Sequence, residues 1–413
     1  MIRLFPFFFA FRILFNKSNT KLFRHIRGAV IGAAISLVPL VVVSEIADGM
    51  IQGIVSRYIE VGSFHIQARL PSGSPEDEAA ALDIISATEG VEMVFPCVQG
   101  SGILYAENGR TGITVRGIPD SVYKENKGFN QYITLEAGEF SLAEPDSIVI
   151  SSETAGKLKA APGDTIKLLT ARIVPGRPVL LRPTSFTVTG IYTSGYQDLD
   201  MLSAFISLEY GTRLFKENGS RMLAVVTSDP FGPELWSVAD SIRSSVPGVR
   251  VADWEGLNDS LVASLDTTRK FLVFIMILIL GVASVNISSS MIMMVISKKQ
   301  DIAILKSSGA SDRDISSIFI ITGLFIGICA AVLGIGVGVL AAVNINGIIG
   351  FLEAVCNVSL FDSRFYLEQI PVEINPGKLA LFALLTLFFS VAASWLPARR
   401  AGKIKPVDIF RKH

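Results

Sequence analysis

The chain has few of the residues that usually carry out chemistry. It contains only three histidines and three cysteines among 413 residues. The histidines, His25, His65 and His413, lie too far apart in the sequence to show metal-ligand spacing. The phosphate-binding pattern G-x-x-x-x-G-K-[ST] does not occur. We therefore expect no catalytic residue, no metal site and no nucleotide site in this chain.

Charge is also scarce. Only 18% of the residues are charged, whereas half are hydrophobic. This composition is too apolar for a soluble protein of the same length, and it indicates a membrane protein with a large water-exposed part.

Uncharged runs locate the membrane spans. They cover residues 28–44, 271–297, 315–352 and 379–398, each near or above the ~17–25 residues that cross a bilayer as a helix. Pro39 lies within the first run and is tolerable, because neighbouring helices can satisfy the freed carbonyl group. The predicted fold class is an α-helical membrane protein with four transmembrane helices and a large α+β extracytoplasmic domain between the first two.

The chain divides into nine segments on this basis. They are a cytoplasmic amphipathic segment (1–27), the first span (28–48), the α+β domain (49–269), the second span (270–297), a cytoplasmic coupling segment (298–314), the third span (315–345), a short outer loop (346–377), the fourth span (378–397) and a basic cytoplasmic tail (398–413).

Basic residues set the orientation. Six Lys or Arg residues precede the first span without any acid, and six follow the fourth span beside only Asp408. Both termini should therefore be cytoplasmic. A cleaved signal peptide is the alternative, but the basic region before Gly28 is too long and no small-residue cleavage site is evident.

The segment 49–269 alternates strand and helix patterns. Strands are expected at 91–95 and 103–107, and Ser74-Pro75-Glu76-Asp77 is a capping-box-like start of a helix. Asn108-Gly109 between two β-rich stretches predicts a hairpin, and the order of elements fits two subdomains, one inserted into the other. Apolar residues at four-residue spacing extend the first two spans outward as stalks, at Ile46, Met50 and Ile54 and at Leu257, Leu261 and Leu265. The alternative is that these stripes merely pack together.

The segment 298–314, KKQDIAILKSSGASDRD, is a mixed-charge stretch between two apolar runs. It reads as a short amphipathic helix stopped by glycine, which could dock into a partner. The candidate docking residues are Asp301, Ile304, Leu305, Lys306, Gly309 and Ala310.

Glycines mark the third span. Gly323/Gly327 and Gly334/Gly338 form small-x-x-x-small pairs that let helices approach closely. This interpretation is favoured over nucleotide binding, because the run lies inside an apolar span. Cys97 and Cys356 should lie outside the membrane, where a bridge is conceivable in an oxidising compartment, but free thiols are expected.

Several motifs together resemble lipoprotein-releasing ABC permeases of the LolC/LolE type, within a wider group that includes MacB-like and FtsX-like permeases. The resemblance covers nearly the whole chain. Its most specific pieces are DIAILKSSGASDRDISSIFIITGLFIG from Asp301, FYLEQIPVEINP from Phe365 and LPARRAGKIKPVDIFR from Leu396.

The resemblance implies a bacterial inner-membrane subunit that pairs with a second permease copy or paralogue. Two cytoplasmic ATPase subunits would supply ATP and Mg²⁺ chemistry, so this chain would hold no cofactor and be no enzyme. Such complexes extract a lipid-anchored protein from the outer leaflet and pass it to a periplasmic carrier. MacB-like efflux and an FtsX-like signalling scaffold are the alternatives.

Two further sites follow from the resemblance. The carrier would bind a protruding loop at 171–184, whose apolar tip is stiffened by proline; a hairpin loop folded back on its own domain is the alternative. The loop candidates are Pro175, Pro178, Val179, Leu180, Leu181 and Pro183. The lipid anchor would enter an apolar cavity, with ordinary helix packing as the alternative, and the candidate lining residues are Ile46, Met50, Phe271, Phe274 and Leu278.

Overall fold

The computed structural model describes residues 20–71, 75–107, 109–172, 180–216, 219–356 and 371–410. The chain forms two compact units. We call them the helical unit (Met1–Met50, Leu265–Val358 and Ile370–His413) and the sheet unit (Ile51–Ser264 and Ser359–Gln369). Each unit has its own buried hydrophobic clusters.

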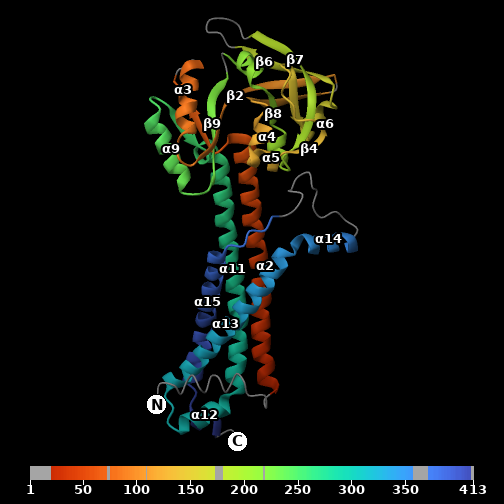
Figure 1. The fold of residues 1–413 in the computed structure, drawn as a ribbon. Helices are drawn as coiled ribbons and strands as arrows, with labels where there is room; N and C mark the ends of the chain where they lie inside the picture. Colours follow the sequence, from red (N-terminus) through yellow and green to blue (C-terminus); the bar gives the residue numbers. More distant parts are fainter. Residues whose placement is uncertain are drawn as a thin grey trace. The chain divides into compact units, whose positions relative to one another are not determined.

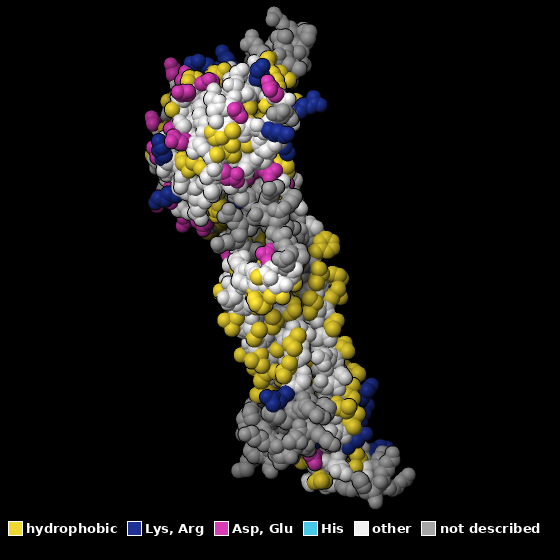
Figure 2. Space-filling model, turned by 90° about the vertical axis from the view of Figure 1, so that its right-hand side faces the viewer, with side chains coloured by type: hydrophobic (Ala, Val, Ile, Leu, Met, Phe, Trp, Pro, Cys, Tyr) yellow, Lys and Arg dark blue, Asp and Glu magenta, His cyan; other side chains and the backbone are white. Residues whose placement is uncertain are grey.

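The helical unit is made of long apolar helices (Figure 1). Its helices are α2 (Thr20–Arg57), α11 (Asp259–Ser297), α12 (Lys299–Ser307), α13 (Asp312–Val343), α14 (Ile345–Cys356), α15 (Pro376–Gly402) and α16 (Pro406–Phe410). Among the described residues, α2, α11, α13 and α15 are long and apolar enough to cross a membrane. Figure 2 shows hydrophobic side chains along these helices, with Lys and Arg side chains near one end on this face.

Local sequence explains where these helices begin. The Ser311 hydroxyl accepts a hydrogen bond from the Asp314 N–H at 3.2 Å, and the Asp314 carboxylate accepts one from the Ser311 N–H at 3.0 Å. This capping box starts α13. Asn375 caps α15, with Pro376 at its first position.

The ends of the helical unit differ from the predicted segments. Residues 1–19 of the predicted amphipathic segment lie outside the described residues, and its last part already belongs to α2. Part of the expected outer loop after the third span forms α14. The expected basic tail contains the end of α15 and the short helix α16.

The sheet unit contains one connected sheet of ten strands in its described part. The strands are β1 (Ile66–Arg69), β2 (Val91–Ala106), β3 (Gly109–Ile118), β4 (Thr134–Gly138), β5 (Ser147–Ser151), β6 (Thr165–Arg172), β7 (Leu180–Thr193), β8 (Ser203–Ser207), β9 (Ser220–Thr227) and β10 (Arg250–Asp253). Their order is β10-β1-β9-β2-β3-β8-β5-β7-β4, and β6 pairs with β2 and β7. The parallel pairing of β3 with β8 joins the strands of both expected subdomains.

Short helices accompany the strands of this unit. They are the π-helix η2 (Tyr58–Ser63), α3 (Pro75–Ser86), α4 (Val122–Glu125), α5 (Lys127–Tyr132), α6 (Ser152–Leu158), α7 (Gln197–Asp200), α8 (Leu208–Leu214), α9 (Glu234–Ser245) and α10 (Trp254–Leu257). Helices α3 and α9 pack against β2 and β10 respectively.

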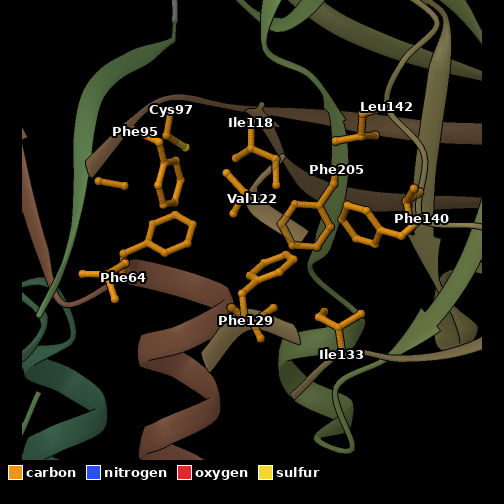
Figure 3. Packing of buried hydrophobic residues seen from close by; sticks show 14 of the residues in the cluster. Phe64, Phe95, Cys97, Ile118, Val122, Phe129, Ile133, Phe140, Leu142 and Phe205 are labelled. Carbon is orange, nitrogen blue, oxygen red and sulfur yellow. The ribbon is translucent and has the colours of Figure 1, made fainter. Parts of the chain in front are cut away.

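Side chains alternate across the sheet and fill two clusters. Phe205 of β8 belongs to one cluster, whereas its neighbours Ala204 and Ile206 belong to the other. Because successive residues of a strand point to opposite faces, the two clusters lie on opposite sides of the sheet. Figure 3 shows the first cluster, in which the rings of Phe129 and Phe205 meet edge to face at 5.3 Å.

The chain enters the sheet through a constrained turn. Phe64 follows η2 with a positive φ of 59° and a buried side chain. Next to it, the buried His65 accepts a hydrogen bond at Nδ1 from the Thr227 N–H at 3.0 Å, and its Nε2 lies 3.0 Å from Glu60. Packing on several sides holds this unusual backbone conformation in place.

Candidate functional site

The helix α12 lies where the sequence predicted a docking helix. Its Ile302 and Ala303 are buried, and Ile302 packs in a cluster with residues of α13 and α15. Gly309 adopts a positive φ of 99°, and the Ala310 N–H donates to the Leu305 carbonyl oxygen at 3.1 Å. Glycine therefore ends this helix as expected for a left-handed C-terminal turn.

The candidate docking residues of α12 have different environments. Ile304 is 56% exposed, whereas Leu305 and Ala310 pack partly against the buried cluster. Asp301 is exposed and pairs with Lys298 at 2.6 Å. Ile304 is thus the apolar candidate that is free to contact another molecule.

Lys306 is engaged within the chain. Its Nζ donates to the carbonyl oxygens of Gly402 at 2.7 Å and Ile404 at 2.9 Å. It also pairs with Asp312 at 2.8 Å. Lys306 therefore ties α12 to the chain that follows α15, and α16 packs against α12.

The predicted glycine pairs lie where α13 meets two other helices. A Cβ atom at Gly323 or Gly327 would come within 2.7 Å of the Cβ atom of Ser394 or Ser390 on α15. The other pair faces α2, where the added Cβ atoms would lie 2.7 Å from the Cβ atoms of its residues Leu37 and Val41. Only glycine permits these close approaches.

The helical unit contains an apolar cavity of about 280 Å³ between α2, α11 and α15. Its lining residues are Pro39, Leu40, Val43, Ser44, Asp48, Arg269, Leu272, Val273, Ile275, Met276, Ile279, Lys378, Leu381 and Phe382. Hydrophobic side chains make up most of this wall, and Ser44 and three charged residues complete it.

The charged residues form a collar, which we define as Asp48, Arg269 and Lys378. The Asp48 carboxylate pairs with Lys378 Nζ, and its other oxygen lies 3.8 Å from Arg269 Nε. Beside the collar, the buried Glu45 accepts a hydrogen bond from the Asn375 N–H at 3.1 Å. The collar gives the apolar cavity one polar, positively charged side.

None of the five predicted lining residues borders this cavity. Ile46 and Met50 are half-buried, and Phe271, Phe274 and Leu278 are exposed on α11. The residues that line this cavity differ from the predicted ones, because the sequence alone does not reveal which neighbouring helix covers each face of a span. The charges of Asp48, Arg269 and Lys378 at the ends of three apolar runs were the available signal.

The predicted carrier loop lies only partly within the described residues. Strands β6 and β7 continue their antiparallel pairing to Arg172 and Leu180, so both ends of the predicted segment 171–184 are strand residues. Leu180, Leu181 and Pro183 belong to β7. Pro175, Pro178 and Val179 lie outside the described residues, as does most of the FYLEQIPV motif.

The sheet unit has a second, polar cavity of about 200 Å³. Arg57 donates from Nε to the Ser194 carbonyl oxygen at 2.7 Å and stacks over the Tyr132 ring at 5.0 Å. Asp200 accepts hydrogen bonds from the Ser194 N–H and the Thr193 hydroxyl at 3.0 Å. Burial nevertheless raises the pKa of Asp200 to about 6.

The cysteines and the metal-ligating residue types form no site in the described part of the chain. Cys97, Cys329 and Cys356 are free. Cys97 is buried in the aromatic cluster, and burial raises the pKa of its thiol to about 12. No group of three or more His, Cys, Asp or Glu side chains among the described residues could hold a metal ion.

Known proteins match both parts of the chain. The MacB-like periplasmic core domain matches residues 28–236, about half of the chain, and the FtsX-like permease C-terminal domain matches residues 273–406. The lipoprotein-releasing system transmembrane protein LolC of Neisseria meningitidis is 26% identical, with 93% of each chain covered. The lipoprotein-releasing system transmembrane protein LolE of Haemophilus influenzae is 26% identical over 73% of each chain.

Solved extracytoplasmic domains are similar over less of the chain. The extracellular domain of the noncanonic ABC-type transporter YknZ is 16% identical, and the match covers 46% of this chain and 99% of that domain, with a TM-score of 0.31. The periplasmic region of MacB from Actinobacillus actinomycetemcomitans is 12% identical, and the match covers 48% of this chain and 93% of that region, also with a TM-score of 0.31. On the family models and the full-length relatives, the chain belongs to the ABC transporter permeases with a MacB-like periplasmic core domain, and its homologues are the LolC/LolE lipoprotein-releasing permeases.

Proposed function

We propose that this chain is the permease subunit of an ABC transporter that extracts lipoproteins from the outer leaflet of the bacterial inner membrane and passes them to a periplasmic carrier. ATP hydrolysis on a separate subunit would drive the extraction. The relatives that cover 93% of this chain are lipoprotein-releasing transmembrane proteins, which supports this role.

The cavity of the helical unit is the observation that carries the proposal. Apolar residues such as Leu272, Met276 and Phe382 line it, and the collar supplies charge on one side. Its volume of about 280 Å³ lies below the roughly 300–1,000 Å³ of pockets for drug-sized ligands. A single slender acyl chain, with its polar end at the collar, suits such a cavity.

Withdrawing a lipid anchor needs a coupled energy source. Each buried CH₂ group contributes about 0.8 kcal/mol to membrane binding, so several acyl chains hold a lipoprotein very tightly. The apolar cavity offsets part of this cost, because an acyl chain that leaves the bilayer for the cavity stays in apolar surroundings. Hydrolysis of ATP, bound with Mg²⁺ by the partner ATPase, would supply the rest of the energy.

The charges support a topology with both termini in the cytoplasm. The four long apolar helices are then the membrane spans, and the sheet unit lies outside the membrane. The end of α15 and its continuation carry Arg399, Arg400, Lys403 and Lys405, which suit the cytoplasmic side. On this topology α12 also lies in the cytoplasm.

Helix α12 is then the docking site for one ATPase subunit. The exposed Ile304 is a small apolar anchor, and the buried Ile302 connects the helix to α13 and α15 through a shared hydrophobic cluster. Movement of the ATPase would therefore reach the spans directly. A second permease copy or paralogue would complete the transporter, and the hairpin between β6 and β7 would meet the carrier.

Photo-crosslinking from single positions tests the cavity. A crosslinker at Val273 or Leu381, which line the cavity, should capture lipoprotein in membranes that contain the whole transporter. The matched control is Val285, which lies on the same helix as Val273, is 70% exposed and does not line the cavity. Equal capture at Val273, Leu381 and Val285 would contradict the assignment of this cavity.

A further inference from the structure

We propose that α14 is a membrane-interface helix whose apolar face lies against lipid at the outer boundary of the bilayer. The proposal rests on the topology proposed above, in which α13 crosses the membrane. It does not depend on which substrate the transporter moves.

The sequence of α14 separates two faces. At about 3.6 residues per turn, Ile345, Ile348, Ile349, Leu352, Val355 and Cys356 fall on one side of the helix. The opposite side holds the small residues Gly347, Gly350 and Ala354, and the polar residues Asn346 and Glu353 border the apolar side. A short helix with an apolar face bordered by polar residues suits a segment that lies in the membrane interface.

Within the described residues most of this apolar face is exposed, whereas Ile345 and Ile349 are half-buried. No residue of α14 is buried, and Val355 is 66% exposed. Phe351, at the flank of the apolar face, is 68% exposed. An apolar face of this kind is unfavourable in water, so it requires a partner.

The position of α14 after α13 indicates that this partner is lipid. The uncharged part of α13, residues 315–343, is about 43 Å long at roughly 1.5 Å per residue. This length matches the ~40–45 Å of a bilayer that includes its headgroup regions. The end of α13 therefore reaches the level of the outer headgroups, and α14 begins there.

The apolar surface is also continuous between the two helices. Val337, Leu340 and Val343 near the end of α13 are exposed, as are residues along α14. Asn344 ends α13 with a non-helical backbone conformation, and its side chain donates to the Leu340 carbonyl oxygen at 2.8 Å. Figure 1 shows that α14 then runs in a different direction from α13. The break lets an apolar stripe that faces lipid on α13 continue along the membrane surface.

The consequence is a fixed depth for this end of α13. An interfacial helix resists movement both into the hydrocarbon and out into water, because either movement places one of its faces in the wrong environment. When ATP-driven force acts on the neighbouring helices, α14 would hold the outer end of α13 at the bilayer surface.

Fluorescence quenching by labelled lipids tests the proposal in the full-length protein. An environment-sensitive dye is attached to single cysteines at Ile348 or Val355 on the apolar face, after Cys329→Ala and Cys356→Ala, and the parent without new cysteines corrects for Cys97. Gly350→Cys is the matched control on the opposite face, where an added Cβ meets no atom within 4 Å. We expect nitroxides placed shallowly in the bilayer to quench the apolar positions about twofold more than the control.

Two outcomes would overturn the proposal. Equal quenching of all positions by a water-soluble quencher would show a helix in solvent, and protection from both lipid and water would show a protein contact such as a second permease copy. A label at Val332, which is 68% exposed on α13, tests the topology separately. If nitroxides placed deep in the bilayer fail to quench the label at Val332, α13 does not cross the membrane as proposed. If they quench this label while the labels on α14 are not quenched by lipid, only the α14 proposal fails.

Discussion

The Nζ atom of Lys306 donates a hydrogen bond to the carbonyl oxygen of Gly402 at 2.7 Å, across almost a hundred residues of sequence. It joins α12, the candidate docking helix, to the end of α15. A force applied to α12 therefore has a direct, charge-assisted connection to the last apolar helix.

The first prediction concerns this connection. Replacing Lys306 with methionine keeps the length of the side chain but removes two hydrogen bonds and the ion pair with Asp312. Hydrogen bonds of charged groups contribute about 1.5–3 kcal/mol each, so residues 403–410 should become more susceptible to limited proteolysis. The exposed Lys299→Met is the control. Equal protection in both variants would show that Lys306 does not hold this segment.

The second prediction concerns docking. Ile304→Glu should reduce copurification of the ATPase about tenfold or more, because truncating or charging a central apolar anchor costs ~2 kcal/mol or more of binding. Membrane insertion should be unchanged, since Ile304 is 56% exposed and lies outside the buried cluster of this unit. Ser308→Glu places the same charge on an exposed position of the following turn. Loss of the ATPase in both variants would indicate a general charge effect.

The third prediction concerns helix packing. Gly338→Leu should destabilise the helical unit by about 1–3 kcal/mol, because the added side chain overlaps Val41 of α2. Gly336→Leu is a matched control two residues away, where an added Cβ meets no atom within 4 Å. The free energy of unfolding in mixed micelles measures the difference. Equal stability of the two variants would exclude a close contact between α13 and α2.

The fourth prediction concerns pH. The folded-state pKa of Asp200 is raised from 3.8 to about 6 by burial, so the folded state binds its proton more tightly than the unfolded state does. The contribution of Asp200 to the free energy of unfolding is therefore greatest below its unfolded pKa of 3.8. This contribution, at most about 3 kcal/mol, is lost as the pH rises from there through about 6. Asp200→Asn should remove this loss. Fluorescence of the buried Trp254 during denaturation at pH 4 to 8, measured in a background with Trp236→Phe and Trp395→Phe, reports it in the sheet unit. The same pH dependence in both proteins would contradict the assignment to Asp200.

Much of the secondary structure could be predicted because local signals were strong. The hairpin at Asn108-Gly109 appears as β2 and β3, with Ala106 paired with Gly109. The Ser-Pro-Glu-Asp signal marks the start of α3, which begins at the proline of this signal, Pro75. Long apolar runs located the long helices, because few other structures can bury so many apolar residues in one segment.

The errors arose where pairing between distant segments decided the structure. Two separate strands were expected at 91–95 and 103–107, but β2 is continuous because β9 and β3 pair along its successive parts. Strand β4 was missed because Thr134–Gly138 has little hydrophobic character and forms an edge strand that pairs only with β7 among the described strands. Within the candidate site, the composition of α12 indicated a helix, but the partner of Lys306 could not be predicted from residues so distant in sequence.

The central claim is that the whole transporter releases lipoproteins by using the cavity of the helical unit. The most direct measurement is ATP-dependent transfer of a lipoprotein from reconstituted membranes to a soluble carrier, with Val273→Trp compared with Val285→Trp. We predict that Val273→Trp reduces transfer at least about tenfold, because the added ring fills the cavity that an acyl chain would occupy, whereas Val285→Trp, whose side chain is 70% exposed on the same helix, retains transfer. Full transfer with Val273→Trp, or no ATP-dependent transfer by the unaltered transporter, would contradict this account.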